Sequence, residues 1–552
     1  MILRFTAFAL LTAIWFGSGA QATLGQVRTV AITGQAAPGG GQFSQFLSYP
    51  VLNDSGNTAF FGVSTAEGLW SEGFGSLSVV AQAGQSAPGQ ANAAYSYFLM
   101  GTRYWAVLND QGQVAFNAIL EGPGILPPTQ ATSTAKSIWL NSSLGTTNLV
   151  ARDYENLNPD QNARLGLTFL NGPALNNAGQ VAFMGRTRGT YTVEAAFIRP
   201  ASNKGMVLKY QDSLPGLSGY AGGIGSEWSD NFRINDAGLT AVIVDLNGPV
   251  LSQQAVWTGN ANSSRVVTYD RAPAPGLGDG WTFYQLNTVS INNRGDVVFQ
   301  ATLKLNGDRA ENDSSIWIDR AGDLRLIAHE GDPAPGLDGV SLGGMVTSTA
   351  KQPPVVNHSG DVAFASLLSG LGVSETNDSA LWSTALSGTH LVAREGDRAP
   401  GTPEGVLFGW FDYSEYSINK LGQTAFLGVM TGPGIQLYQN DIGIWAEDKF
   451  GVLQLIVREG QMLEVAPGDS RKVKDLNFIS GSGNEDGRQS GFNERGQVAF
   501  WAAFQDGSSG IFVSDAVLVP EPATLSLALF GALAVGIACV RRRGRRGGTM
   551  AQ

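Results

Sequence analysis

The chain has 552 residues, of which 43% are hydrophobic, only 15% are charged and 72 are glycine. This composition, with few long helix-favouring runs, predicts an all-β protein with many tight turns. The net charge is −11, and residues 23–519 carry 45 acidic and 29 basic side chains. No nucleic-acid partner is expected, because phosphate binding needs a basic surface. The single cysteine, Cys539, excludes a disulfide framework or a cysteine-based metal site within one chain.

The first 22 residues have the pattern of a secretory signal peptide. Arg4 precedes an apolar run at residues 5–16, and a small-x-small site at Ala20 and Ala22 stands before Thr23. Cleavage after Ala22 is therefore expected, which predicts an exported protein. A buried N-terminal helix is the alternative interpretation of the same run.

The C-terminal end has the pattern of a short membrane anchor. Eighteen apolar or small residues at 523–540 would span about 27 Å as a helix, close to the minimum for a bilayer core. The cluster Arg541, Arg542 and Arg543 should stay in the cytoplasm, which leaves the body on the far side of the inner membrane. Residues 516–522 would link the body to this helix, and residues 541–552 would form a basic cytoplasmic tail.

Three residues directly before this apolar run, Pro520, Glu521 and Pro522, complete a second pattern. The order of proline-rich motif, apolar segment and basic end resembles the bacterial PEP-CTERM sorting signal. The resemblance implies a Gram-negative host and an exosortase-type processing enzyme, which recognises and removes the tail after transient anchoring in the inner membrane. The body would then reach the cell surface or the extracellular matrix. A plain C-terminal membrane anchor is the alternative.

Residues 27–515 are organised by the octet Asn-x-x-Gly-x-x-Ala-Phe, which occurs eight times at intervals of 56 to 74 residues. An asparagine at the first position of a type I turn can bond the backbone ahead, and a glycine at the fourth supplies a positive φ. Each octet therefore predicts a hairpin corner. The corner residues are Asn53 and Gly56, Asn109 and Gly112, Asn176 and Gly179, Asn235 and Gly238, Asn292 and Gly295, Asn357 and Gly360, Asn419 and Gly422, and Asn493 and Gly496.

The strand after each corner, such as residues 114–116, is apolar on both faces, which indicates a sheet that is covered from both sides. A large Phe on one face and a small Ala on the other would let neighbouring sheets interlock. An apolar-aromatic strand such as 138–139 and an aliphatic strand such as 391–393 also recur, so each period of about sixty residues holds about four strands. Eight such units predict an eight-bladed β-propeller. A seven-bladed propeller and an open β repeat array are the alternatives.

The two ends of the repeat region complement each other. The last repeat has its octet and an aromatic strand at 511–512 but lacks the aliphatic strand, whereas the region begins with an aliphatic strand at 29–31. We therefore expect residues 27–52 to complete the final blade and close the ring, which would remove open sheet edges.

The repeat region as a whole resembles the bacterial tandem-repeat family defined by Asn-x-x-Gly-x-x-Ala-Phe, whose members carry interchangeable C-terminal anchors. Three repeats depart from the pattern: Val242 replaces Phe in the fourth, Val298 replaces Ala in the fifth, and residues 152–160 lack the Ala-Pro-Gly turn in the third. The resemblance implies a surface or matrix role and no assigned reaction.

Candidate sites in the body are few. His329, His358 and His390 lack metal-ligand spacing, and the turns at Asn53 and Asn235 lack the ligands of a calcium loop. A charged segment recurs at 329–332, 394–397 and 458–461, where carboxylates on one rim could bind a cation or act on a sugar. Its repetition favours a structural turn, and the tripeptide at 294–296 is the corner of the fifth repeat.

These patterns predict an exported interaction or structural module without enzymatic activity or cofactor, with a polysaccharide or a surface protein as candidate partner. The alternative is a secreted carbohydrate hydrolase or lyase with carboxylates near the central channel, and a purely structural repeat protein is a third. A functional site should be marked by loops that differ between repeats. The inserts at 121–137, 152–171 and 469–491 are therefore expected to converge on one face.

Overall fold

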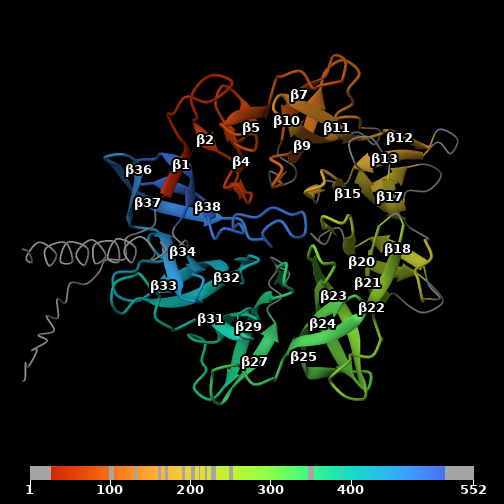
Figure 1. The fold of residues 1–552 in the computed structure, drawn as a ribbon, viewed down its shortest axis with the longest axis vertical. Helices are drawn as coiled ribbons and strands as arrows, with labels where there is room; N and C mark the ends of the chain where they lie inside the picture. The colour runs from red at the N-terminus through yellow and green to blue at the C-terminus, as the bar shows by residue number, and fades with distance from the viewer. Residues whose placement is uncertain are drawn as a thin grey trace, which may run out of the picture.

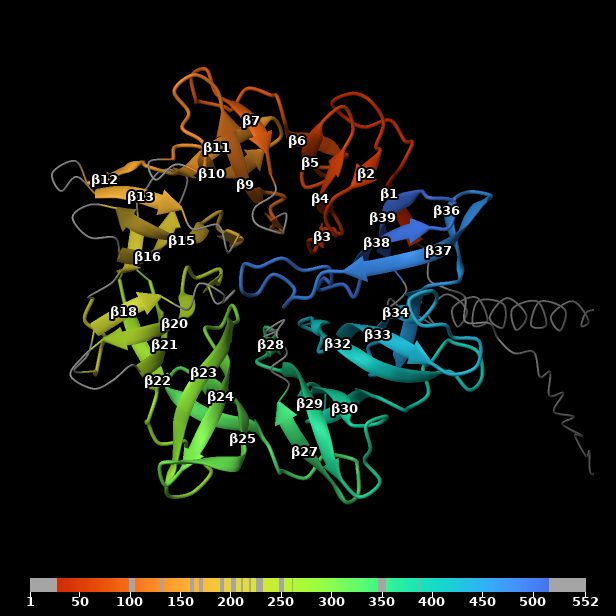
Figure 2. The same cartoon turned by 180° about the vertical axis from the view of Figure 1, so that it is seen from behind.

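A computed structural model of the protein shows eight small β-sheets arranged in a ring (Figure 1; seen from behind in Figure 2). It describes residues 27–98, 105–129, 133–158, 163–167, 172–188, 193–199, 205–209, 212–217, 220–224, 232–247, 253–260, 262–345, 354–386 and 388–515. The predicted signal peptide, PEP motif, apolar segment 523–540 and basic tail lie outside these residues. Within the described ranges, no helix is long and apolar enough to cross a membrane.

The first four sheets, blades 1 to 4, follow one another along the chain. Blade 1 contains β2 (Gln45–Phe46), β3 (Val51–Leu52), β4 (Thr58–Val63), β5 (Glu67–Ser71) and β6 (Ser78–Gln82). Blade 2 contains β7 (Ala94–Tyr97), β8 (Ala106–Leu108), β9 (Val114–Glu121), β10 (Lys136–Ser143) and β11 (Thr146–Arg152). Blade 3 contains β12 (Asn156–Asn158), β13 (Ala163–Leu167), β14 (Ala174–Leu175), β15 (Val181–Arg188), β16 (Val193–Arg199) and β17 (Gly205–Lys209). Blade 4 contains β18 (Tyr220–Ile224), β19 (Arg233–Ile234), β20 (Thr240–Asn247), β21 (Gln253–Gly259) and β22 (Ser264–Tyr269).

Blades 5 to 8 complete the ring. Blade 5 contains β23 (Trp281–Ile291), β24 (Val297–Leu305), β25 (Asp308–Arg320) and β26 (Asp323–His329). Blade 6 contains β27 (Val340–Met345), β28 (Val355–Val356), β29 (Val362–Gly370), β30 (Ser379–Ser383) and β31 (His390–Arg394). Blade 7 contains β32 (Leu407–Ile418), β33 (Thr424–Thr431), β34 (Ile442–Glu447) and β35 (Leu453–Arg458). Blade 8 contains β36 (Met462–Ala466), β37 (Asp469–Phe478), β38 (Val498–Phe504), β39 (Ser509–Ser514) and the N-terminal β1 (Val27–Ile32).

The prediction of an all-β, eight-bladed propeller is confirmed, and the seven-bladed and open alternatives are wrong. Each octet leads into a strand that lies inside its sheet, with a hydrogen-bonded neighbour on both sides. The octet Phe faces an aromatic residue of the next strand, as Phe116 faces Trp139 in blade 2 and Phe426 faces Trp445 in blade 7. In blade 4, Val242 takes this place opposite Trp257.

Neighbouring blades interlock through the two apolar faces of the octet strand. The Ala of one blade shares a buried cluster with the Phe of the following blade, as Ala59 does with Phe116 and Ala115 with Phe183. The series closes on itself, because Ala499 of blade 8 shares a cluster with Phe60 of blade 1. Small and large side chains thus alternate around the ring and fill the space between sheets, as the octet predicts.

Ring closure is made by the N-terminus, as expected, but by a shorter segment than expected. Strand β1 pairs antiparallel with β39, from Val27 opposite Ser514 to Ile32 opposite Gly510. It supplies the aliphatic strand that the last repeat lacks. The expectation that all of residues 27–52 join the final blade is wrong, because β2 and β3 pair with β4 in blade 1. These two strands complete blade 1 along the edge of β4 that β5 does not cover.

Removal of the closing strand should destabilise the whole ring. A variant that begins at Thr33 loses the β1–β39 ladder and the buried Val30 and Ala31. We expect a loss of roughly 3–5 kcal/mol of unfolding free energy, together with aggregation through the open edge of β39. Urea unfolding and light scattering measure both, with a variant that begins at Val27 as the control. Equal stability of the two variants would contradict closure by β1.

Candidate functional site

The corners of the eight octets form a closed ring of hydrogen bonds around the centre. The side-chain Nδ2 of each octet asparagine donates to the backbone carbonyl of the next octet asparagine. The donor and acceptor pairs are Asn53 to Asn109 (3.0 Å), Asn109 to Asn176 (2.9 Å), Asn176 to Asn235 (2.9 Å), Asn235 to Asn292 (2.9 Å), Asn292 to Asn357 (2.9 Å), Asn357 to Asn419 (2.9 Å), Asn419 to Asn493 (3.2 Å) and Asn493 to Asn53 (2.9 Å). All eight side chains are buried, so each bond forms where water does not compete.

The other end of each asparagine side chain shapes its own corner. Oδ1 of Asn53 accepts the backbone N–H groups of Ser55 and Asn57, and the N–H of Gly56 donates to the Asn53 carbonyl. The octet glycines all have φ between 74° and 85°, in the left-handed region. At Gly179 a Cβ would also lie only 2.9 Å from Oε1 of Gln113 in the preceding blade. Asparagine therefore joins the blades, and glycine permits both the turn and the close approach.

A second ring, formed by the residues that follow the asparagines, is incomplete. The backbone N–H of one such residue donates to the side chain of the next. These contacts are Asp54 to Asp110 (2.8 Å), Asp110 to Asn177 (2.8 Å), Asn177 to Asp236 (2.8 Å), Asp236 to Asn293 (2.7 Å), Lys420 to Glu494 (2.6 Å) and Glu494 to Asp54 (2.9 Å). The residue that follows the octet asparagine is His358 in blade 6 and Lys420 in blade 7. The Lys420 ammonium group cannot accept a hydrogen bond.

The segment between β37 and β38 extends into the middle of the ring (Figures 1 and 2). Residues 479–491, here named the central segment, contact the blades in descending order, except that Nδ2 of Asn484 donates to Asp110 of blade 2 at 3.4 Å. Gly481 donates to Ser417 of blade 7, Glu485 contacts blades 6 and 5, and Asp486 accepts from Ile234 of blade 4. The remaining contacts are Gly487 with Leu175 of blade 3, Gln489 with Ala106 of blade 2, and Ser490 with Leu52 of blade 1.

Several of these contacts satisfy backbone groups at the inner ends of the blades. The residue directly before an octet asparagine donates its N–H to a carbonyl of the central segment at Leu52 (2.7 Å), Leu175 (2.8 Å) and Ile234 (3.0 Å). The salt bridge between Arg233 and Asp486 (2.9 Å) is buried at the same place. The central segment thus occupies the middle of the ring as part of the fold, because buried donors need partners.

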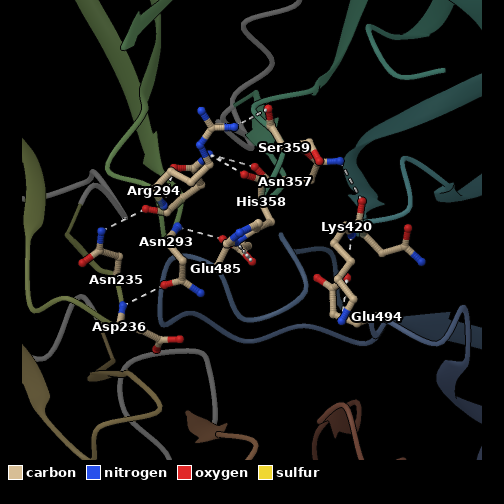
Figure 3. Close-up of polar contacts among 12 residues, drawn as sticks. Asn235, Asp236, Asn293, Arg294, Asn357, His358, Ser359, Lys420, Glu485 and Glu494 are labelled. Carbon is tan, nitrogen blue, oxygen red and sulfur yellow. Dashed lines mark hydrogen bonds and ion pairs between the residues drawn. The ribbon is translucent and has the colours of Figure 1, made fainter. Parts of the chain in front are cut away.

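Glu485 of the central segment fills one gap in the second ring. Its Oε2 accepts the backbone N–H of Asn293 at 2.7 Å, where the repeat pattern would place an acceptor from His358 (Figure 3). Its Oε1 lies 3.4 Å from Nδ1 of His358. A carboxylate supplied by the eighth repeat therefore takes the role that the histidine leaves open in the sixth.

Burial of acidic groups in this second ring raises their pKa values. Desolvation, together with the neighbouring Asp54, raises the pKa of Glu494 to about 8, against the opposing effect of the Lys420 N–H bond. Desolvation and the nearby Asp110 raise the pKa of Asp54 to about 6. The pKa of Glu485 is also raised, mainly by burial, while its bonds from Asn293 and His358 oppose the rise. At neutral pH, Glu494 is therefore mostly protonated and the centre carries less negative charge than its composition suggests.

The recurrent charged segments lie away from this centre, and each serves its own blade. Oε2 of Glu330 accepts the N–H of Ser314 (3.3 Å), that of Glu395 accepts the hydroxyl of Ser379 (3.0 Å), and that of Glu459 accepts the N–H of Ile442 (3.1 Å). Each contact joins a turn to a neighbouring strand of the same blade. Burial raises the pKa of Glu395, and raises that of Glu459 to about 7.

The three histidines are dispersed. His329 contacts the carbonyl of Asn312, His358 lies beside Glu485, and His390 lies 3.2 Å from Glu447. Within the described part of the chain, no group of three or more His, Cys, Asp or Glu side chains could hold a metal ion. Asp296 of the tripeptide 294–296 is buried and accepts a hydrogen bond from Asn292 in its corner.

The expectation that the three long inserts converge on one face stays a prediction, because their distance from the centre does not tell which face they lie on. Residues 469–478 form strand β37 of blade 8, and only 479–491 reach the middle of the ring. Strands β12 and β13, from the second insert, lie at the periphery of blade 3 (Figure 1). Sequence reasoning missed the central segment, although the interval of 74 residues before Asn493 and the dense Gly, Ser and acidic residues of 479–491 were signals of it.

Geometry therefore defines a class: a closed eight-bladed β-propeller, joined by an asparagine ring, with its own chain in the middle. A model of a family of unknown function (DUF7453) matches residues 9–128 and 64–526, and the chain belongs to this family. The two matches overlap, which is expected of repeats that align in more than one register. Membership of the Asn-x-x-Gly-x-x-Ala-Phe family stays a prediction.

A PEP-CTERM protein-sorting motif matches residues 518–543, which confirms that resemblance. Such a motif implies an exported, cell-surface-directed protein that an exosortase-type enzyme recognises. A search of curated proteins found no match to the chain.

Solved structures similar to the chain are distant. An oligogalacturonate lyase in complex with manganese is 9% identical, with a TM-score of 0.35 over 90% of this chain and 98% of that one. A puromycin-hydrolyzing peptidase of Mycobacterium tuberculosis is 12% identical, with a TM-score of 0.35 over 83% of this chain and 58% of that one. The β-propeller domain of the Trilobed protease from Pyrococcus furiosus is 8% identical, with a TM-score of 0.33 over 75% and 98%. Nothing about activity follows from likeness at this level.

Interruption of the asparagine ring should destabilise the propeller. In Asn109→Asp the corner keeps its acceptor, but an oxygen replaces the Nδ2 donor that faces the Asn176 carbonyl. We expect a loss of about 2–4 kcal/mol in unfolding free energy, because a buried acceptor loses its partner and gains a repulsive neighbour. Urea unfolding measures it. The exposed Gln111→Ala in the same turn should change stability by less than about 0.5 kcal/mol, and similar losses in both variants would contradict a specific role of the ring.

The raised pKa of Glu494 predicts a dependence of stability on pH. The folded state holds this proton more tightly than the unfolded chain, so the stabilisation is complete below pH 4.5 and is lost as pH rises towards 8. We expect the unfolding free energy to fall between pH 5 and pH 8 by up to roughly 3 kcal/mol from this group.

Glu494→Gln should flatten this dependence, because an amide keeps the acceptor for the Lys420 N–H and carries no charge. Denaturant unfolding at a series of pH values measures the slope. Glu311→Gln, at an exposed position, should leave the slope unchanged. A Glu494→Gln variant with the wild-type slope would refute the assignment.

Proposed function

We propose that this protein is a non-enzymatic interaction or structural module of the cell surface or extracellular matrix. In this proposal an exosortase-type enzyme removes the tail at Pro520, Glu521 and Pro522, after residues 523–540 have anchored the chain transiently in the inner membrane. The predicted signal peptide ending at Ala22 and the PEP-CTERM motif matched at 518–543 support the route. The ligand class proposed is a polysaccharide or another surface protein.

The use of the acidic groups at the centre of the ring supports a non-enzymatic role. Asp54, Asp110, Asp236, Glu485 and Glu494 each accept a backbone N–H from the ring. A carboxylate pair that hydrolyses a glycoside must instead face the scissile bond, as proton donor and as nucleophile or base. The carboxylates that the hydrolase alternative requires near the channel are thus already engaged in holding the corners together.

Replacement of the motif should trap the protein before release. We expect the body of the wild-type chain in the surface or medium fraction, shortened at its C-terminus, in a host that carries an exosortase. Replacement of Pro520, Glu521 and Pro522 by alanine should leave the full-length chain in the inner membrane, because the processing enzyme loses its recognition motif. Fractionation with mass spectrometry measures both, and Glu404→Gln on the body serves as a control that should not change release.

The released body also separates binding from catalysis. Incubation with a glycan array and product analysis of the same glycans should give binding without turnover. Turnover of any glycan that is lost on replacement of a carboxylate pair would overturn the non-enzymatic assignment, whereas release of the alanine variant would overturn the processing route.

A further inference from the structure

The described chain ends beside the corners of the ring. Asp515 follows β39, and its carboxylate accepts a hydrogen bond from Gln497 in the corner of blade 8. Since β39 and β34 are the corresponding strands of blades 8 and 7, Asp515 corresponds to Asp448. We name the side that carries the octet corners, Asp515 and the β34–β35 turn the corner face. The exit of the chain and the features of blade 7 described below therefore share one face.

The sequence leaves little length between this face and the apolar segment. Seven residues, 516–522, separate Asp515 from Ala523 and can reach at most about 25 Å when fully extended. While residues 523–540 are held in a bilayer, as the proposed function requires, the corner face next to blade 8 must stay within that distance of the lipid. The inference that follows rests on this anchoring step.

A group of large apolar side chains is exposed on the corner face of the blades next to this exit. The exposed fractions are 56% for Leu386, 55% for Leu421, 70% for Phe450 and 54% for Val452. Leu386 lies between the two turns of blade 7 that carry the others: its Cδ1 is 2.9 Å from where a Cβ of Gly451 would lie, and Gly422 approaches Ala385 just as closely. These four exposed side chains lie on adjacent turns, and together we name them the blade 6–7 patch.

The charges around the blade 6–7 patch are basic, in contrast to the acidic body. Lys449 and Arg495 are exposed, and the Lys420 side chain is half exposed. The neighbouring acids are turned inward: Asp448 accepts the N–H groups of Phe450 and Val452. Glu447 accepts the N–H of Thr424 and contacts His390, and both acids are buried. The patch therefore combines exposed apolar residues with positive charge.

We propose that the blade 6–7 patch rests on an anionic phospholipid surface before the tail is processed. Leucine and phenylalanine side chains flanked by lysine and arginine are the combination by which proteins bind at the boundary between headgroups and acyl chains. Contact through this patch would fix the corner face towards the bilayer. It would also hold the seven-residue linker with Pro520, Glu521 and Pro522 at the membrane surface.

Hydrogen–deuterium exchange of the full chain in lipid nanodiscs tests this contact. In nanodiscs that contain phosphatidylglycerol, backbone amides of residues 384–390 and 447–453 should exchange more slowly than in detergent. The turn between β29 and β30, at the end of blade 6 opposite the octet corner, carries Leu371, which is 85% exposed, and it should exchange equally in both. The double variant Leu386→Ser and Phe450→Ser should lose the protection, and Leu371→Ser should keep it. Since all three side chains are exposed, the variants should retain the wild-type melting temperature.

Each outcome of this experiment decides one point. Protection that is equal at Leu371, or that survives the double variant, would overturn the assignment to this patch. Protection in detergent that grows with protein concentration would instead indicate a second copy of the chain as the occupant. Absence of protection in a chain that resists carbonate extraction from vesicles would overturn the lipid contact alone, whereas extraction by carbonate would overturn the anchoring step of the proposed function.

Discussion

The hydrogen bond from one octet asparagine to the carbonyl of the next is the interaction on which the rest of the structure depends. Each asparagine uses Oδ1 to shape its own corner and Nδ2 to join the following blade, so a single side chain specifies both local turn and neighbour. Eight such bonds return to their start only when all eight corners are present. The octet Ala of one blade also packs against the octet Phe of the next blade, and this packing likewise returns to its start at blade 1. Blade number is therefore fixed jointly by polar and apolar contacts.

Because the ring is closed, the backbone N–H groups at the inner ends of the blades lie close together in its middle. The central segment satisfies them and contributes Glu485 where the sixth repeat has His358. A position that deviates from the repeat in one blade is thus compensated by a residue from another blade. The buried acids Glu494 and Asp54 accept backbone hydrogen bonds, and desolvation raises their pKa values. This combination is expected of carboxyl groups that are buried to hold a structure together.

Much of this architecture could be predicted from the sequence because its signals are local and repeated. The corner at Asn109 and Gly112, the doubly buried strand that follows it and the missing aliphatic strand of the last repeat are all visible in the chain. The bond from Asn109 to Asn176 was not predictable, since it joins positions 67 residues apart and needs the ring to exist. The course of residues 479–491 was missed for a related reason. A segment with one aliphatic residue and four glycines has no periodicity, and its contacts are with seven other blades.

The late position of the central segment in the chain has a consequence for folding during export. If the chain is exported with its N-terminus first, seven repeats emerge before residues 479–491 do. Until then, the N–H groups of Leu52, Leu175 and Ile234 lack their final acceptors. Asn493, which accepts the hydrogen bond from Asn419 and donates one to Asn53, is also missing. Strand β1, the first to arrive, must wait for β39, among the last. The contacts that close the ring can therefore form only near the end of translocation, and a chain that stops earlier leaves its sheets unclosed.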